Sequence, residues 1–222
     1  MHIITNEVEY NKYKLMKEFI LYVLSKSDFF DYYVLKSYEC IDNLFFDLSF
    51  VLIDKNKNVN FNDYINYLKD KLLFYNLDYS FKDNILIINN MSIQFEIVID
   101  NNPCNNLRNK LEYRFLPFPF VVRIYDNETL FALNIKDILQ GNINVKILYR
   151  YVLFLTKDIR VNIGVLNIDI NILKNMLNEK FKLIDYEAAK NDVAPFLDDS
   201  TKLNIWSMEF FQSITDNLHE EQ

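Results

Sequence analysis

Glycine and proline are scarce, with 2 and 4 residues among 222. A phosphate-binding loop needs glycine wherever its backbone must approach the ligand closely. The GxGxxG and Walker A patterns are absent, and so are HExxH, GxSxG and CxxC. The sequence therefore carries no signature of a Rossmann dinucleotide site, a P-loop, a zinc protease or a serine hydrolase.

Cysteine and clustered basic charge are also lacking. The 2 cysteines, Cys40 and Cys104, fit a reducing compartment better than a disulfide framework. The net charge is −7, and no run of lysine or arginine stands out. Because DNA-binding proteins gain affinity by neutralising phosphates, this balance disfavours duplex DNA as a partner, whereas RNA stays open.

Long apolar stretches are missing too. No segment of about 18 uncharged apolar residues occurs, and the N-terminus has no basic stretch of the kind that opens a secretion signal. We therefore expect no membrane partner and a cytoplasmic protein.

Core-forming residues, by contrast, are abundant, because 50% of the residues are hydrophobic and 16% are aromatic. In the first 125 residues, helical periodicity at 8–26 and 61–75 is interspersed with strand-like runs at 44–53, 85–88, 91–99 and 119–125. After Asn127 only helical periodicity remains, at 128–139, 145–157, 164–178 and 201–218. We predict an α/β protein: a domain over 1–125 with a mixed sheet flanked by helices, and a helical C-terminal domain over 126–222 packed against it.

Asp47 is the most informative polar residue of the first half, because it interrupts an apolar, strand-like run. A buried carboxylate is costly unless it is paired, hydrogen-bonded or bound to a metal. A D-x-D pair on a strand would hold Mg²⁺, but here Ser49, a poor Mg²⁺ ligand, stands two residues on. The alternative is an aspartate at the sheet rim that accepts hydrogen bonds from backbone N–H groups.

Asp100 ends a second strand-like run and precedes Asn-Asn-Pro, a sequence typical of turns. It gains functional interest only if its strand lies beside Asp47. Glu96 would share a face with Asp100 if the strand stays regular.

Several segments, taken in order, resemble the AbiEii family of nucleotidyltransferase-like toxins from type IV toxin–antitoxin and phage-abortive systems. They run from about residue 28 to 217, and their joint order is more specific than any one of them. In the first half they are FFDYYVLK (29–36), DLSF (47–50) and DNNP (100–103). In the second half they are LPFPFVVRIYDNETLFA (116–132), KDIRVNIGVL (157–166), DYEAAKNDVAPFLDD (185–199) and LNIWSMEFF (203–211). The resemblance implies a nucleotidyltransferase-like fold.

The first half departs from the family at the groups that perform chemistry. The family follows its "VLK" segment with a glycine-rich turn that approaches nucleotide phosphates, whereas Lys36 is followed here by Ser37 and Tyr38. The spacing from Lys36 to Asp47 is also short. The family's D-x-D survives only as Asp47, because Ser49 replaces the second aspartate. The resemblance aligns Asp100 with a third carboxylate.

The second half departs as well. Where the resemblance implies a phosphate-contacting lysine, the sequence has Asn134, with Lys136 two residues on. Ile147 and Arg150 stand in the places of later aspartates. Losing Mg²⁺ charge stabilisation costs several kcal/mol of barrier, and about 1.4 kcal/mol is already tenfold in rate. We therefore expect a catalytically degenerate protein rather than an enzyme.

Three functions follow as expectations. The first is a nucleotidyltransferase-like protein that acts by binding, in phage defence or a toxin–antitoxin system, with an antitoxin or a defence-complex subunit as its protein partner. The second is an active transferase that uses Mg²⁺ and an NTP, with Asp47 and Asp100 as metal ligands and Lys36, Ser37, Ser49, Asn134 and Lys136 near the nucleotide. The third is a purely structural subunit of a larger complex, which the many aromatic residues would suit.

Overall fold

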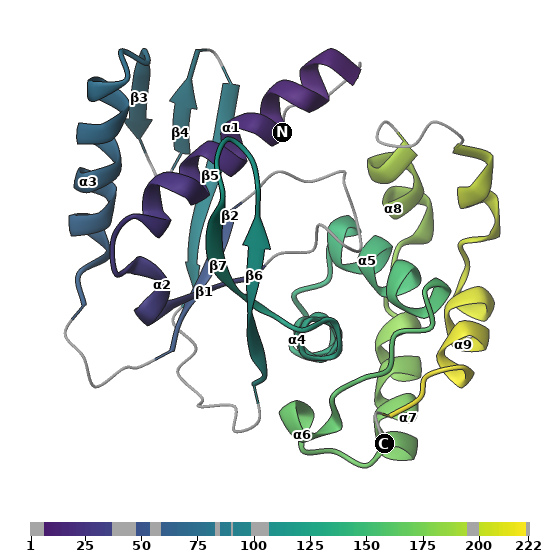
Figure 1. Ribbon diagram of the computed structural model, residues 1–222. Helices are drawn as coiled ribbons and strands as arrows, with labels where there is room; N and C mark the ends of the chain where they lie inside the picture. The colour runs from purple at the N-terminus through teal and green to yellow at the C-terminus, as the bar shows by residue number, and fades with distance from the viewer. Residues whose placement is uncertain are drawn as a thin grey trace. The chain divides into compact units, whose positions relative to one another are not determined.

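The computed structural model describes residues 7–36, 48–53, 59–82, 85–89, 91–98, 107–194 and 200–220 (Figure 1). The protein is mixed α/β, and the chain divides into two compact units. Of the described residues, 7–36, 48–98 and 109–125 belong to the first unit, and 107–108 and 126–220 to the second. Within these ranges no helix combines the length and the apolar character that crossing a bilayer requires.

The first unit is built on one mixed sheet. Its described strands run in the order β3-β4-β5-β2-β1-β7-β6. β2 is antiparallel to β1 and parallel to β5, and β1 is parallel to β7. The strand bounds are β1 Tyr33–Leu35, β2 Leu48–Leu52, β3 Tyr79–Lys82, β4 Ile85–Ile88, β5 Met91–Val98, β6 Asn109–Arg114 and β7 Phe120–Tyr125.

Three described helices, α1 (Glu7–Ser25), α2 (Phe29–Tyr32) and α3 (Phe61–Phe74), supply the rest of the first unit's core. The strand residues of this core alternate along each strand, so they lie on one face of the sheet. Phe50, for example, packs edge-on against Phe29 of α2 with ring centroids 4.9 Å apart. Val34, Ser49 and Val51 point to the opposite face and are also buried.

The predicted helices 8–26 and 61–75 are confirmed as α1 and α3. The start of α3 follows from its cap, because the side chain of Asn60 accepts a hydrogen bond from the backbone N–H of Asn62 at 3.1 Å. The strand-like runs 85–88, 91–99 and 119–125 correspond to β4, β5 and β7. The described part of the run 44–53 forms β2. Strands β1, β3 and β6 were not predicted.

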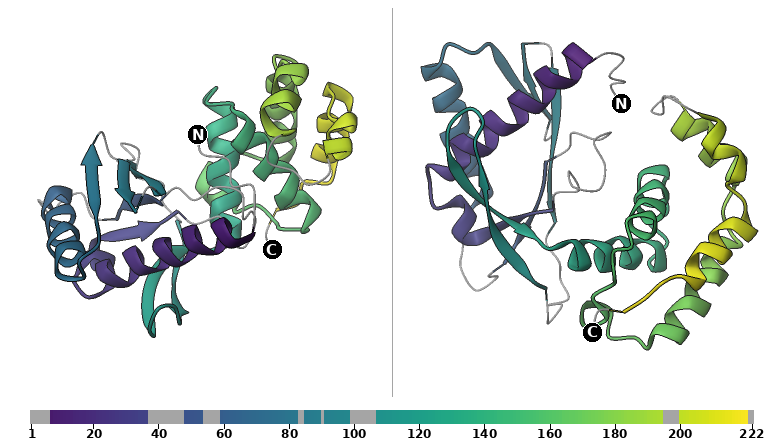
Figure 2. Two further views of the ribbon diagram at one scale, coloured as in Figure 1. Left: turned by 90° about the horizontal axis from the view of Figure 1, so that it is seen from above. Right: turned by 45° about the vertical axis from the view of Figure 1, so that its right-hand side comes forward.

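The second unit is helical over its described residues. It contains α4 (Asn127–Leu139), α5 (Val145–Thr156), α6 (Ile163–Leu166), α7 (Ile170–Phe181), α8 (Tyr186–Val193) and α9 (Met208–Asp216), with a 3₁₀ helix over Ser200–Ile205 (Figure 2). The predicted helix 164–178 is divided into α6 and α7, because Asn167 adopts a left-handed conformation with φ 53°. The predicted helix 201–218 is likewise divided, into the 3₁₀ helix and α9.

An aromatic cluster forms the core of the second unit. Phe131 of α4 stacks on Phe154 of α5 with ring centroids 4.7 Å apart. Phe181 of α7 lies 5.2 Å from Phe211 of α9, and Trp206 meets the edge of Phe211 at 5.4 Å. Each of these side chains is at most 3% exposed. Aromatic packing therefore joins helices from both ends of the unit.

Candidate functional site

The end of β1 lies beside the beginning of β2. The backbone N–H of Lys36, the residue directly after β1, donates a hydrogen bond of 2.7 Å to the carbonyl oxygen of Ser49. This contact follows from the antiparallel register that pairs Leu35 with Phe50. Two segments singled out in the sequence, VLK and DLSF, are therefore neighbours in space along their described residues.

Ser49 is buried and its hydroxyl has no partner among the described residues. Its side chain is 8% exposed, and its Oγ makes no hydrogen bond there. An unpaired buried hydroxyl costs about 1–3 kcal/mol. Such an atom is a candidate for contact with a ligand, because a ligand could supply the missing bond.

The strand next to β2 brings a further sequence candidate to Ser49. β2 and β5 are parallel, and their register pairs Ser49 with Glu96. Paired residues of neighbouring strands lie on the same face of the sheet, with backbones about 4.8 Å apart. Lys36, Ser49 and the backbone position of Glu96 are therefore brought together in the first unit.

Asp47, Asp100 and Ser37 lie outside the described residues, so their roles stay predictions. The register nevertheless separates the strand ends to which the two aspartates are attached. β2 begins at Leu48, which pairs with Phe95, and β5 ends at Val98, which pairs with Val51. Three residues of strand span about 10 Å. The beginning of β2 is thus nearer to Glu96 than to the end of β5.

Asn134 and Lys136 belong to α4 of the second unit. Asn134 is 1% exposed, and its Nδ2 donates to the carbonyl oxygen of Ile147 at 3.1 Å, while its Oδ1 has no partner within the described residues. The hydrogen bond of Asn134 therefore links α4 to α5. Lys136 lies in the last turn of α4 and is half-buried. Ile147 is buried in α5 and Arg150 is half-exposed there.

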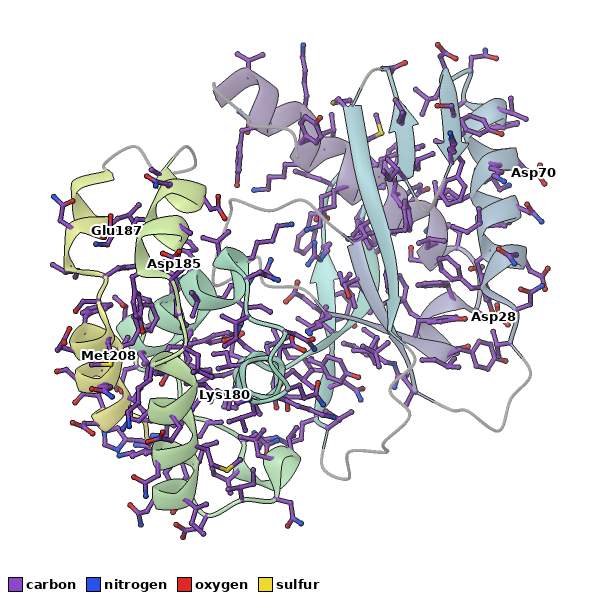
Figure 3. All side chains as sticks on the ribbon, turned by 180° about the vertical axis from the view of Figure 1, so that it is seen from behind. Asp28, Asp70, Lys180, Asp185, Glu187 and Met208 are labelled. Carbon is purple, nitrogen blue, oxygen red and sulfur yellow. The ribbon has the colours of Figure 1, made fainter. Side chains whose placement is uncertain are left out.

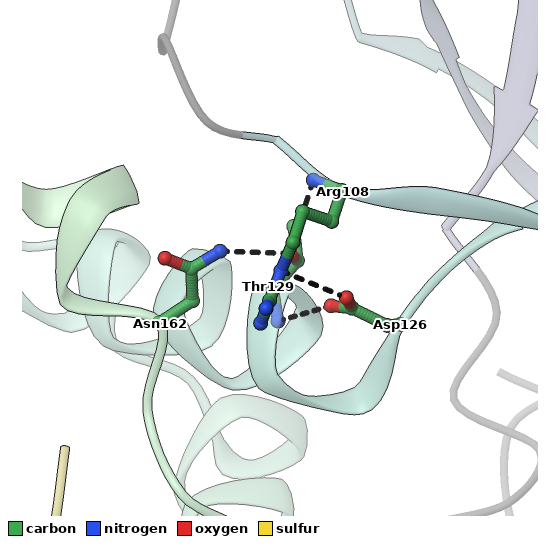
Figure 4. Close-up of polar contacts among 4 residues, drawn as sticks. All are labelled: Arg108, Asp126, Thr129 and Asn162. Atoms are coloured by element: carbon green, nitrogen blue, oxygen red, sulfur yellow. Dashed lines mark hydrogen bonds and ion pairs between the residues drawn. The ribbon is translucent and has the colours of Figure 1, made fainter. Parts of the chain in front are cut away.

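A polar cluster that sequence reasoning missed surrounds the start of α4 (Figure 4). Asp126 caps the helix by accepting a 2.8 Å bond from the backbone N–H of Thr129, and its Oδ2 lies 3.1 Å from Nε of Arg108. The hydroxyl of Thr129 accepts from the backbone N–H of Arg108 and from Nδ2 of Asn162, both at 3.3 Å. Asp126 before an amphipathic helix is a recognisable N-cap signal, whereas its pairing with Arg108 depends on the fold.

A surface hollow of about 410 Å³ in the first unit is lined by Ser27, Asp28, Tyr32, Val59, Asn60, Asp63, Tyr64 and Tyr67. Two of its polar groups are bonded to each other, because the hydroxyl of Tyr64 donates to Asp28 at 2.9 Å (Asp28 is labelled in Figure 3). Burial, and then this bond, raise the pKa of Tyr64. None of the predicted site residues that the structure describes lines this hollow.

A second hollow, of about 600 Å³, lies between α7 and α9 and is lined mainly by polar side chains. Its lining likewise includes none of the predicted site residues within the described ranges. Among the described residues, no three His, Cys, Asp or Glu side chains gather as a metal site would require. The positions that the structure brings together are those around Ser49.

Comparison with known proteins adds no relative, because no family model, no curated protein and no solved structure matches this chain.

Proposed function

We propose that this chain is a catalytically degenerate nucleotidyltransferase-like protein of the AbiEii type, which acts by binding in a phage-defence or toxin–antitoxin setting. One observation carries the proposal. The end of the VLK segment, the DLSF segment and strand β5 are adjacent, through the Lys36–Ser49 bond and the Ser49–Glu96 register. A nucleotidyl-transfer site would need a phosphate-binding turn and metal carboxylates at one such place.

The residues at this place argue for binding rather than catalysis. Ser49 offers a neutral hydroxyl where a second carboxylate would help hold Mg²⁺. In the sequence, Ser37 and Tyr38 follow Lys36 where the resemblance implies a glycine turn, and neither residue has the backbone freedom with which glycine approaches phosphate. Asn134 uses its amide within the helical unit. We therefore propose that function needs neither Mg²⁺ nor an NTP.

The partner class follows from the same proposal. A defence protein without catalysis acts through what it binds, and an antitoxin or another subunit of a defence complex is the partner that we propose. RNA is a second candidate, since the charge of −7 weighs most against duplex DNA.

A transfer assay tests the proposal. Purified protein is incubated with radioactive ATP, GTP, CTP or UTP, Mg²⁺, and bulk tRNA or bacterial protein. We expect no labelled product. Label that appears with the natural chain and disappears with Asp47→Ala would show that the site is active and the proposal wrong. Ser49→Asp, which restores a second carboxylate, is the matched variant for detecting a site that lacks only this group.

A second candidate function is an active Mg²⁺-dependent transferase. The observation that favours it is the β2–β5 register, which pairs Ser49 with Glu96. In the sequence it relies on Asp47 and Asp100, but the β2–β5 register makes Glu96 the nearer strand position to Ser49. Calorimetry with each NTP and Mg²⁺ tests it. If heat is released, Glu96→Gln should abolish binding and Asp100→Asn should spare it, whereas the reverse result would restore Asp100 as the ligand. No heat with any NTP rejects this function.

A further inference from the structure

Strand β6 is an edge of the sheet, because it pairs with β7 and with no other described strand. The backbone N–H of Asp126 donates to the carbonyl oxygen of Arg108 at 3.3 Å. This bond extends the β6–β7 register by one residue and marks Arg108 and Asp126 as a hydrogen-bonded pair. Hydrogen-bonded pairs alternate along antiparallel strands. Lys110, Glu112 and Arg114 therefore bond to β7, and Asn109, Leu111 and Tyr113 direct their backbone groups to the open edge.

The open edge carries large apolar side chains. Leu111 is 60% exposed and Tyr113 is 74% exposed, and the hairpin that joins β6 to β7 adds Phe115, Leu116 and Phe118 at 53–72% (β6 and β7 are labelled in Figure 1). Proteins usually protect such an edge with proline, a bulge or a covering segment. A strand whose free backbone groups and exposed apolar side chains coincide is suited to pairing with another strand.

We propose that β6 pairs antiparallel with β6 of a second copy of this chain, with Leu111 facing Leu111 across a two-fold axis. In this register the outward backbone groups of Leu111 bond to their counterparts, and those of Asn109 bond to Tyr113. Lys110 then faces Glu112 of the second copy, and Glu112 faces Lys110. The interface thus contains two Lys–Glu pairs and an apolar centre, each of which stabilises a cross-strand contact.

Charge and apolar contact together select this register over its neighbours. A shift that preserves the hydrogen-bond alternation moves the pairing by two residues. One such shift places Glu112 opposite Glu112 and Lys110 opposite Arg114. The other places Lys110 opposite Lys110 and Arg108 opposite Glu112, and it replaces the Leu111–Leu111 contact with Leu111 opposite Asn109. Like charges directly opposite one another are destabilising. Arg108 and Arg114, which face each other in the proposed register, already have carboxylate partners in Asp126 and in Glu18 and Glu112.

The same symmetry argues for a second copy as the occupant. A strand that complements β6 must offer an acid opposite Lys110 and a base opposite Glu112, with an apolar residue between them. The sequence KLE of β6, read in the opposite direction, is itself such a strand. The pairing is isologous, so it closes at a dimer.

Sedimentation velocity over a range of concentrations tests the proposal. We expect a monomer–dimer equilibrium in the natural chain. Lys110→Glu and Glu112→Lys should each raise the dimer dissociation constant by roughly tenfold or more, because each puts like charges opposite one another twice. An equimolar mixture of the two variants should form heterodimers, since both pairs formed by residues 110 and 112 are then of opposite sign. Thermal unfolding confirms that both variants fold.

Two further variants locate the interface. Leu111→Asp should remove the dimer, and Leu183→Asp, at a leucine that is 79% exposed in the second unit, should not. In a Cys40→Ser, Cys104→Ser background, Leu111→Cys should form a disulfide-linked dimer on mild oxidation and Leu183→Cys should not.

Three results would overturn the proposal. They are a monomer at every concentration, a dimer that survives both charge reversals and Leu111→Asp, and a mixture of Lys110→Glu and Glu112→Lys that stays monomeric. The second of these would place any dimer interface elsewhere.

Discussion

Tyr151 is fully buried, and its hydroxyl lies 2.8 Å from Oγ1 of Thr215. Burial raises the pKa of this phenol above its ordinary value of 10.0. A phenol with a raised folded pKa contributes stability that is complete below about pH 10 and is lost as the pH rises, because the unfolded chain loses its proton first. We expect the free energy of unfolding to fall above pH 10, and to fall less steeply in Tyr151→Phe.

Urea unfolding at several pH values measures this difference. At neutral pH, Tyr151→Phe should cost about 1 kcal/mol, because the hydrogen bond to Thr215 is lost. The difference between the two proteins should then shrink as the pH rises. Tyr75→Phe is the control, since Tyr75 is 47% exposed. Equal slopes for Tyr151→Phe and the natural chain would show that another group governs the alkaline loss.

The ion pair between Arg114 and Glu18 is buried in the first unit, where each residue is at most 9% exposed. Removing Glu18 leaves Arg114 with the partly exposed Glu112, 3.0 Å away, so the loss should lie at the low end of the roughly 3–5 kcal/mol that an uncompensated buried charge typically costs. We expect Glu18→Leu to destabilise the protein by about 3 kcal/mol. The double variant Glu18→Leu, Arg114→Met should recover most of that loss, because it removes both charges. A double variant that is less stable than Glu18→Leu would assign Arg114 a stabilising role of its own.

At the scale of elements, apolar periodicity in the sequence predicted the helices and strands that form by burying apolar side chains. The helices α1 and α3 and the strands β4, β5 and β7 bury a regular apolar stripe or run, so their sequences reveal them. β6, with the sequence NKLEYR, has only two apolar residues, and both are exposed. It is a strand because β7 pairs with it. The three-residue β1 follows α2 without a turn signal. Ser49 could be singled out from its strand, but its neighbour Glu96 required the register of β2 and β5.

The cap of α4 is the element-scale contact with the clearest consequence. Asp126 accepts from Thr129 and pairs with Arg108, whereas Asp185 caps α8 through Ala188 at 3.0 Å. An N-cap is worth about 1 kcal/mol, and the charge of Asp126 adds to it. Asp126→Ala should therefore lower the free energy of unfolding by about 1–2 kcal/mol, and more than Asp185→Ala does. Far-UV circular dichroism during urea unfolding measures both. A larger loss from Asp185→Ala would contradict this ranking.

At the scale of the molecule, the boundary between the two units lies between Tyr125 and Asp126. Residues 107–108, which precede the β6–β7 hairpin in the sequence, also belong to the second unit. Their contribution there is the contact between Arg108 and the start of α4. The second unit has an aromatic core of its own, centred on Tyr151 and Phe211. A unit with its own core can fold alone.

The fragment 126–222 should therefore fold as an autonomous helical domain, with a cooperative urea transition followed by circular dichroism. Because it lacks Arg108, the contribution of Asp126 should reduce to the cap. Asp126→Ala should then cost less in the fragment than in the full chain, by up to about 1 kcal/mol for a partly exposed ion pair. Arg108→Ala in the full chain should reproduce that difference, since it removes the same contact and leaves the cap. An unfolded fragment would show that the core of the second unit is insufficient by itself. A fragment in which Asp126→Ala costs as much as in the full chain would show that the Arg108 pair contributes nothing measurable.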